Sequence, residues 1–293
     1  MAKGNVGIIG LGIMGSAISA NLVDAGWDVT GYDIDATRLE QLRASGGRAG
    51  TSTADVAAAN DVVLTSLPSV KAFEAVVAEL AATGREGLAV AELSTLPLDV
   101  KERARDDLAA AEITLLDCPL SGTGAQALTR DLSVYASGDL DAIERCRGVF
   151  DGFANLTFVI GAFGTGSRMK FVANLLVAVH NLASAEAFVL GMKAGLDPQA
   201  ILDVVSRGAG NSRVFELRGP MMAAGEYDES TMKLEVFRKD VAIISEFAAA
   251  IDCPTPLLSA SLPLYAAALG QGRDKQDTAA LCAVLEQMAG LHR

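Results

Sequence analysis

The chain has 293 residues, of which 51% are hydrophobic and 20% are charged, and its formal net charge at pH 7 is −12. This composition predicts a folded protein with a large core, long enough for two domains. The acidic charge excludes nucleic acid and anionic membrane surfaces as expected partners. Two histidines and four scattered cysteines supply no zinc site, disulfide framework or Ser-His-Asp triad, so we expect no metal and a cytoplasmic location with reduced thiols.

Up to residue 161, short apolar runs alternate with amphipathic segments. Strands are predicted at residues 6–10, 28–32, 61–67, 88–93, 113–117, 132–136 and 156–160. Helices are predicted between most of them, at residues 13–24, 36–44, 70–81, 98–110 and 139–150. This alternation predicts an α/β domain with a doubly wound, mainly parallel sheet of Rossmann type.

After residue 161 the pattern becomes helical, and Gly and Pro residues punctuate it. The predicted domains are residues 1–163, a dinucleotide-binding Rossmann domain, and residues 164–293, an all-α substrate and dimerisation domain. The second begins with a long interdomain helix over about residues 166–194. Polar residues such as Asn174 and Glu186 interrupt its apolar run, which predicts a buried helix of a soluble protein and no membrane span. Because the helix is apolar on more than one face, we expect a homodimer or homotetramer.

A glycine-rich turn lies between the first predicted strand and the first helix. Gly10, Gly12 and Gly15 form a G-x-G-x-x-G pattern, which permits a tight turn and lets the backbone and the helix N-terminus approach a pyrophosphate. Asp33 follows the second strand, where a carboxylate can accept hydrogen bonds from the ribose hydroxyls of NAD and repel the 2′-phosphate of NADP. The pattern predicts that NAD is the cofactor and that NADP is disfavoured.

Lys170 and Asn174 lie near the start of the long helix, at the predicted domain junction. The lysine is either a helix-end residue that extends its ammonium to solvent or an acid/base that exchanges a proton with a substrate oxygen. The i, i+4 spacing places Asn174 on the same face, where its amide can position the lysine or the substrate. Burial would lower the pKa of such a lysine toward a useful range. We favour the catalytic interpretation.

Ser121, Gly122 and Thr123 are predicted to form a turn directly after a strand. Their backbone N–H groups and the Ser121 hydroxyl can bind a substrate carboxylate. Lys239 is expected either to neutralise that carboxylate or to lie beside the nicotinamide, with a solvated helix charge as the alternative.

Several separated motifs resemble those of the β-hydroxyacid dehydrogenase family, which includes the 3-hydroxyisobutyrate dehydrogenases and tartronate semialdehyde reductases. The motifs are GIIGLGIMGSAISANL, ELST, DCPLSGTGAQA, GTGSRMKFVANLL and FRKDVAII. The resemblance implies hydride transfer between NAD and a short hydroxyacid, with Lys170 as the catalytic lysine and Asn174 as its partner. It also implies cofactor contacts, which we assign to Ile13, Met14, Leu67, Pro68, Thr95 and Lys239. Cys118, Thr123 and Ala173 depart from the family pattern.

The stretches GAGNSRVFELR and GRDKQDTAAL resemble most the threonate and erythronate dehydrogenase branch. Which hydroxyacid is used, and whether C2 or C3 is oxidised, stays open. Two alternatives are an imine reductase of the same architecture and a dinucleotide-binding protein without activity. Lys170 argues against the first, because imine reductases lack the catalytic lysine, and its combination with Ser121 and Asn174 argues against the second.

Overall fold

The computed structural model describes residues 3–293, which form two compact units, one up to Lys170 and one from Phe171 onward. The first unit holds β1 (Asn5–Ile9), β2 (Asp28–Tyr32), β3 (Arg48–Ala49), β4 (Val62–Thr65), β5 (Ala89–Glu92), β6 (Thr114–Asp117), β7 (Leu120–Ser121), β8 (Ser133–Ser137) and β9 (Leu156–Gly161). Its helices are α1 (Ile13–Asp24), α2 (Ala36–Ala44), α3 (Thr53–Ala59), α4 (Val70–Ala82), α5 (Leu98–Ala109), α6 (Gly124–Leu128) and α7 (Leu140–Phe153).

The strands of this described unit form one nine-stranded sheet in the order β3-β2-β1-β4-β5-β6-β8-β7, and β9 pairs with β8. Strands β1 to β6 run parallel, whereas β8 is antiparallel to β6. The carboxyl ends of the parallel strands therefore meet at one edge of the sheet, which is where ligands bind in open α/β folds. The predicted doubly wound sheet is confirmed.

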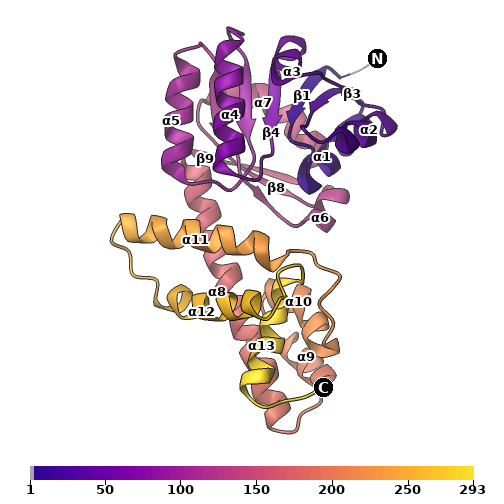
Figure 1. Ribbon diagram of the computed structural model, residues 1–293, viewed down its shortest axis with the longest axis vertical. Helices are drawn as coiled ribbons and strands as arrows, with labels where there is room; N and C mark the ends of the chain where they lie inside the picture. The colour runs from indigo at the N-terminus through magenta and orange to yellow at the C-terminus, as the bar shows by residue number, and fades with distance from the viewer. Residues whose placement is uncertain (1–2) are drawn as a thin grey trace. The chain divides into compact units, whose positions relative to one another are not determined.

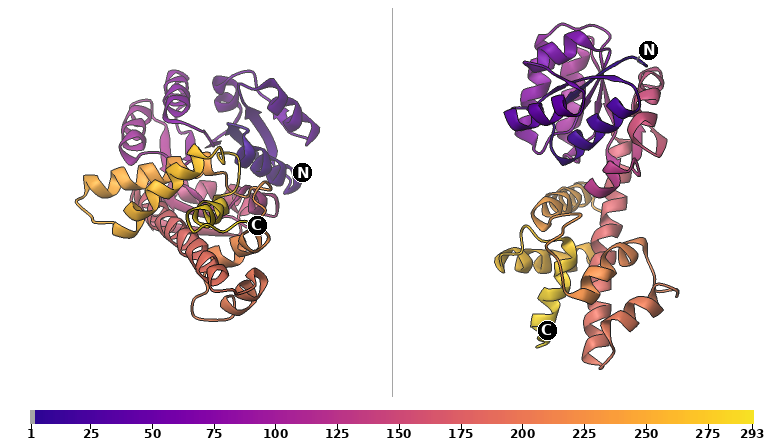
Figure 2. Two further views of the ribbon diagram at one scale, coloured as in Figure 1. Left: turned by 60° about the horizontal axis from the view of Figure 1, so that its bottom comes forward. Right: turned by 90° about the vertical axis from the view of Figure 1, so that its right-hand side faces the viewer.

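Helices cover both faces of the sheet (Figures 1 and 2). On one face, α1 and α7 bury Ile18, Leu22 and Phe150 against strand residues such as Ile8. On the other, α4 and α5 bury Phe73 and Leu108 against a second set of strand residues. Because β4 and β5 are buried on both faces, their sequences are apolar without alternation up to the last residues, Thr65 and Glu92.

Two pairs of short elements were not predicted. These are β3 with α3, and β7 with α6. A two-residue strand is too short to show alternation, and the alanine-rich α3 has little hydrophobic contrast between its faces. As a consequence Ser121, which was expected in a turn, is the last residue of β7 and pairs with Ser133 of β8.

The second unit is helical. Its elements are α8 (Thr165–Lys193), which starts in the first unit, α9 (Pro198–Val205), α10 (Arg213–Ala224), α11 (Leu234–Ala250), α12 (Pro256–Gly270), η1 (Thr278–Ala280) and α13 (Leu281–Met288). No described residue after Gly161 belongs to a named strand. The predicted all-α part is thus confirmed, and the long helix begins within a residue of its predicted start.

Helix α8 is long and apolar enough to cross a membrane by length and composition alone, with a mean hydropathy of 1.6. However, it buries one stripe of side chains inside the protein, at intervals of three or four residues. The stripe contains Phe171, Asn174, Ala178, Asn181, Leu182, Ala185 and Phe188. Buried asparagines with protein partners are typical of a core helix of a soluble protein.

Candidate active site

The glycine loop joins β1 to α1, and the surroundings of its three glycines explain why these positions lack a side chain. Gly10 has a φ of +90°, and a Cβ there would lie 2.2 Å from the carbonyl oxygen of Ser66. A Cβ on Gly15 would lie 1.9 Å from the carbonyl oxygen of Gly10. A Cβ on Gly12, in contrast, would meet nothing within 4 Å. The first two positions therefore allow the loop to pack, and Gly12 leaves open space in front of the helix.

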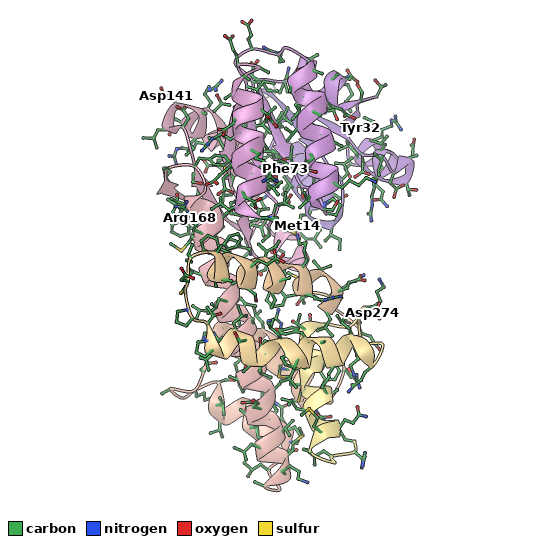
Figure 3. All side chains as sticks on the ribbon, turned by 60° about the vertical axis from the view of Figure 1, so that its left-hand side comes forward. Met14, Tyr32, Phe73, Asp141, Arg168 and Asp274 are labelled. Carbon is green, nitrogen blue, oxygen red and sulfur yellow. The ribbon has the colours of Figure 1, made fainter. Side chains whose placement is uncertain are left out.

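Helix α1 begins at this open space without a side-chain cap. Other helices of the unit are capped by Asp35, Ser52, Ser69 and Asp139, whose side chains accept a backbone N–H. An uncapped helix start facing open space is a site for a phosphate group, which can accept those N–H groups and interact favourably with the helix dipole. Ile13 is exposed and Met14 half-buried at this end of α1 (Met14 is labelled in Figure 3). The loop residues thus fit a dinucleotide.

Asp33 lies next to the glycine loop. It follows Tyr32, the last residue of β2 (labelled in Figure 3). Its Oδ2 accepts the N–H of Leu11 at 2.6 Å, and its Oδ1 accepts the N–H of Asp35 at 2.9 Å. The carboxylate is half-buried and is therefore held beside the loop in an orientation that fits a ribose.

The loops after β4 and β5 adjoin the glycine loop. A Cβ on Gly10 would lie 3.1 Å from a methyl group of Leu67, which places Leu67 and Pro68 beside the turn. The N–H of Leu67 donates to Ser94 Oγ at 2.8 Å. Since Thr95 follows Ser94, this bond ties the two predicted cofactor loops together.

The predicted carboxylate loop reaches the same region. A Cβ on Gly124 would lie 2.7 Å from Ile13 Cγ2, and Asn21 Nδ2 of α1 donates to the carbonyl of Ala127 at 2.6 Å. Thr123 caps α6, and its own N–H donates to Gln126 Oε1 at 3.0 Å. Because that N–H has an internal acceptor, a carboxylate site in this loop depends on Ser121 and Gly122.

The start of α8 is held against the sheet by Asp117, the last residue of β6. Asp117 Oδ2 accepts the N–H of Ser167 at 2.7 Å, and Oδ1 accepts the Ser167 hydroxyl at 2.7 Å. The N–H of Gly166 donates to Ser137 Oγ at 3.0 Å, and that hydroxyl donates to the carbonyl of Asp117 at 2.9 Å. A Cβ on Gly166 would lie 2.3 Å from the Tyr135 carbonyl oxygen, so this glycine allows the helix to reach the strands. These contacts keep the first turn of α8 in the first unit, and the chain therefore divides after Lys170, beyond the predicted boundary at residue 163.

A second buried charge accompanies Asp117. Lys101 of α5 is fully buried, and its Nζ donates to Asp117 Oδ1 and to the Ser94 carbonyl, each at 2.8 Å. Burial by itself lowers the pKa of Lys101, but the carboxylates of Asp117 and Glu92 raise it by more in total. The Lys101 pKa therefore lies above its ordinary value, and this lysine is an ammonium ion at neutral pH.

Lys170 lies one turn after Ser167 and is half-buried. Asn174, one further turn along, is buried and donates to Asp240 Oδ2 of α11 at 2.9 Å. Asp240 Oδ1 lies 3.5 Å from Lys239 Nζ. The second unit therefore joins two predicted site residues, Asn174 and Lys239, through a carboxylate to which the sequence analysis gave no role.

Asp240, Lys101 and Asp117 were thus missed as site components. Asp117 appeared only as the first residue of a motif, and Lys101 as part of an amphipathic helix. The signal for Lys101 was its position in the apolar stripe of Val100, Ala104 and Leu108, where an unpaired lysine would be costly. Within residues 3–293, no three His, Cys, Asp or Glu side chains are grouped as a metal site would require.

Two family models together match most of the chain. Residues 5–161 match the NAD binding domain of 6-phosphogluconate dehydrogenase, and residues 164–285 match the NAD-binding domain of NADP-dependent 3-hydroxyisobutyrate dehydrogenase. The chain is 32% identical to an L-threonate dehydrogenase of Cupriavidus necator over 241 residues, which are 81% of each protein. It is 30% identical to an NAD-dependent L-serine dehydrogenase of Pseudomonas aeruginosa over 249 residues, 80% of this chain and 82% of that protein.

The structure is similar to that of a 3-hydroxyisobutyrate dehydrogenase from Mycobacterium tuberculosis solved with L-serine. The TM-score is 0.89 at 28% identity, and the match covers 97% of this chain and 99% of the other. The two family models extend over the glycine loop, the Asp117 region and the helical unit alike. The chain therefore belongs to the β-hydroxyacid dehydrogenase family and is an NAD(P)-dependent oxidoreductase that acts on CH–OH donors.

Proposed function

We propose that this enzyme uses NAD to oxidise a short hydroxyacid, or to reduce the corresponding carbonyl compound, and that Lys170 is the general acid/base. The observation that supports the role of Lys170 best is the fixed start of α8. The helix turn before Lys170 is bonded to Asp117 and Ser137 at the carboxyl ends of the strands, the edge at which the glycine loop also lies. A lysine extended freely to solvent would need no such support.

In this proposal Lys170 handles the proton and the loops hold the substrate. Bound NAD supplies the acceptor for the hydride that leaves the carbinol carbon. Lys170, as the neutral amine, removes the hydroxyl proton, so the C–H and O–H bonds break while the C=O bond forms. In the reverse direction the ammonium form of Lys170 donates that proton to the carbonyl oxygen. Asn174 is oriented by Asp240 and can then direct its carbonyl oxygen toward the lysine or the substrate.

The preference for NAD depends on Asp33. Its carboxylate is held beside the glycine loop by two backbone N–H groups. At this position a carboxylate accepts hydrogen bonds from ribose hydroxyls and repels a 2′-phosphate. The NAD-dependent relative supports the same choice.

The substrate class follows from the chemistry near Ser121. A short acid with a carboxylate can accept hydrogen bonds from Ser121 and Gly122, and Lys239 supplies a positive charge in an otherwise acidic protein. L-Threonate is the first compound to test, because L-threonate dehydrogenases are among the similar proteins. Thr95 is assigned to the nicotinamide side of the site.

A panel assay tests the proposed function. Purified enzyme is mixed with NAD or NADP and with L-threonate, D-erythronate, L-serine, 3-hydroxyisobutyrate or D-glycerate, and formation of the reduced cofactor is followed by absorbance. We expect turnover of at least one acid, with higher kcat/KM for NAD than for NADP. A cyclic imine with reduced cofactor tests the imine reductase alternative, and absence of turnover with every compound, despite NAD binding, would favour a non-catalytic protein.

Assembly and location belong to the same proposal. The face of α8 opposite its buried stripe exposes Val172, Leu176 and Leu190, and we propose that a second subunit covers it in a homodimer or homotetramer. Light scattering at micromolar concentration tests this. With an acidic surface and three of its four cysteines buried as thiols, we propose that the enzyme works in the cytoplasm.

A further inference from the structure

We propose that Lys101 and Asp117 are positioning residues, whose buried ion pair fixes the first turn of α8 and thereby the direction of Lys170. The inference rests on the proposed acid/base role of Lys170. All of the groups that carry it lie in the first unit, and both side chains of the pair are fully buried. Arg168, labelled in Figure 3, lies in the same helical turn as Ser167 and Lys170.

The first step concerns the N-terminus of α8. The Asp117 carboxylate is bound by Lys101 Nζ and the Ser167 hydroxyl on one oxygen, and by the Ser167 N–H and the Ser137 hydroxyl on the other. A carboxylate at this place accepts an N–H group that the first helical turn cannot satisfy internally, and the helix dipole favours its negative charge. Asp117 thus replaces a local cap by one from the sheet. Since Lys170 follows Ser167 by three residues, this contact sets the rotation of the helix at the lysine.

The second step concerns Lys101. A carboxylate withdrawn from water needs a charge partner to stay ionised, and Lys101 is that partner. Its bond to the Ser94 carbonyl extends the link to the loop of Thr95, and Ser94 Oγ in turn accepts the N–H of Leu67. The pair therefore connects α8 with two loops assigned to the cofactor.

The third step asks whether the pair is needed only for folding. A buried ion pair adds little net stability compared with apolar side chains of the same volume. Lys101 lies among Val100, Ala104 and Leu108, in a stripe where an apolar residue would pack well. An aligned acid/base explains why this position carries a lysine, because a misplacement of about 1 Å can reduce the rate about 100-fold.

The test replaces both charges by groups of similar volume, in Lys101→Met/Asp117→Asn. We expect kcat, with NAD and L-threonate or the fastest acid of the panel, to fall about 10- to 100-fold. The dissociation constant of NAD should change by less than about threefold, because the glycine loop and Asp33 are untouched and Leu67 keeps its hydrogen bond to Ser94 Oγ. Hydrogen–deuterium exchange of residues 165–172 should become faster, and this readout does not depend on activity.

Leu108→Ala is the matched control, because Leu108 is a fully buried residue of the same helix without a bond to Asp117. It should lower the melting temperature while kcat and the exchange of residues 165–172 stay as in the wild type. If the double variant does not fold, Ser167→Ala removes one bond to Asp117 and leaves the ion pair intact. It should then reduce kcat about three- to tenfold, the effect of one lost hydrogen bond.

Unchanged kcat or unchanged exchange in the charge-free variant would overturn the positioning role, as would an equal loss in Leu108→Ala. Lys170→Ala, assayed in parallel, separates this failure from that of the proposed function. An inactive Lys170→Ala with a fully active Lys101→Met/Asp117→Asn refutes positioning alone. An active Lys170→Ala refutes the acid/base role, and with it the inference.

Discussion

Each unit of the protein contains a buried ion pair, and the two pairs are built differently. In the first unit Lys101 is hydrogen-bonded to Asp117 at 2.8 Å, and both are fully buried. In the second unit the guanidinium Nε of Arg218 lies 3.3 Å from Asp277 Oδ1 but does not form a hydrogen bond with it. A buried charge pair is therefore not by itself a sign of function. The other groups that bond to its carboxylate indicate whether it serves the active site or stability.

Those partners differ in kind. The remaining donors to Asp117 include Ser167, on the helix that carries Lys170. Asp277 accepts the N–H groups of Thr231 and Met232, in the connection between α10 and α11, and that of Ala279 in the short helix η1. The Asp117 pair thus acts on the helix that carries Lys170, whereas the Asp277 pair joins the α10–α11 connection to η1. The first should affect the rate, and the second should affect stability.

Lys170→Ala should have the largest effect. Loss of a general acid/base reduces kcat about 10²–10⁴-fold, while NAD affinity should stay nearly unchanged because the glycine loop and Asp33 remain. Lys170→Arg should restore little, because a guanidinium cannot give up its proton at working pH. Steady-state kinetics and calorimetric NAD binding measure the two quantities.

Lys193→Ala is the control for this variant, since Lys193 is an exposed lysine at the other end of α8, where its Nζ donates to the Ala289 carbonyl. It should keep the wild-type rate. If Lys170→Ala retained kcat within about threefold of wild type, Lys170 would be a helix-end lysine. The Lys101–Asp117 pair would then have no effect on catalysis, and the two ion pairs would not differ in function.

Asp277→Ala should break the second pair and mainly reduce stability. Removing one partner of a buried pair leaves an uncompensated charge and costs about 3–5 kcal/mol of unfolding free energy. The urea midpoint of unfolding should fall more when it is followed by far-ultraviolet circular dichroism than when it is followed by Trp27 fluorescence. The reason is that the chain's single tryptophan lies in the first unit, whereas Asp277 lies in the second. The kcat of the folded variant should stay within about threefold of wild type.

Asp274→Ala, at a half-exposed acid three residues earlier (labelled in Figure 3), should leave both transitions in place. A large loss of kcat in Asp277→Ala, at a urea concentration where the protein is fully folded, would mean that the second pair also serves the site. The distinction between the two pairs would then fail.

Asp33→Ala tests the cofactor side of the first unit. Loss of hydrogen bonds to a charged acceptor costs about 1.5–3 kcal/mol, so kcat/KM for NAD should fall about 10- to 100-fold. The value for NADP should fall less or rise, because a repelling charge is removed. Asp35→Ala, which removes only the cap of α2, should keep the NAD/NADP ratio, and a wild-type preference for NADP would contradict the role of Asp33.

The parts of this molecule that could be predicted from the sequence are those specified by residues close together in the chain. The glycine loop directly follows β1 and precedes α1, and the Lys170 helix is one continuous, mainly apolar stretch of sequence. The link between Lys101, Asp117 and Ser167 spans 16 and 50 positions of sequence. No local pattern encodes which strand end a buried lysine will meet, so such a contact appears only once the sheet order is known.

One local signal predicts a helix start where a turn was expected. Thr123 and Gln126 have the spacing of a capping box, which predicts a helix start in place of an open turn. Read in this way, the sequence would have predicted α6 and would have shown that the Thr123 N–H has an internal acceptor. The position of Asp240 opposite Asn174, in contrast, depends on how α8 and α11 pack, and the sequence alone does not specify this.

One buried thiol in each unit should have no effect on stability at neutral pH and an effect that appears only above pH 9. Burial raises the pKa of Cys146, in α7, from 9.0 to about 12, and burial together with Glu286 raises that of Cys282, in α13, to about 12. In both cases the folded-state pKa lies above the unfolded one. The stability that each thiol contributes is therefore fully present below pH 9 and is lost as the pH rises toward 12.

Each such thiol should lower the unfolding free energy by about 1.4 kcal/mol per pH unit in that interval, because the unfolded chain releases a proton that the folded one keeps. Cys146→Ala should reduce the slope of unfolding free energy against pH when urea unfolding is followed by Trp27 fluorescence, since Trp27 packs on α7 near Gly148 and Gly152. Cys282→Ala should reduce the slope seen by circular dichroism. Cys253→Ala, at an exposed cysteine, should change neither. Equal slopes in wild type and Cys146→Ala would show that this thiol already ionises in the folded protein, so that α7 admits water at alkaline pH.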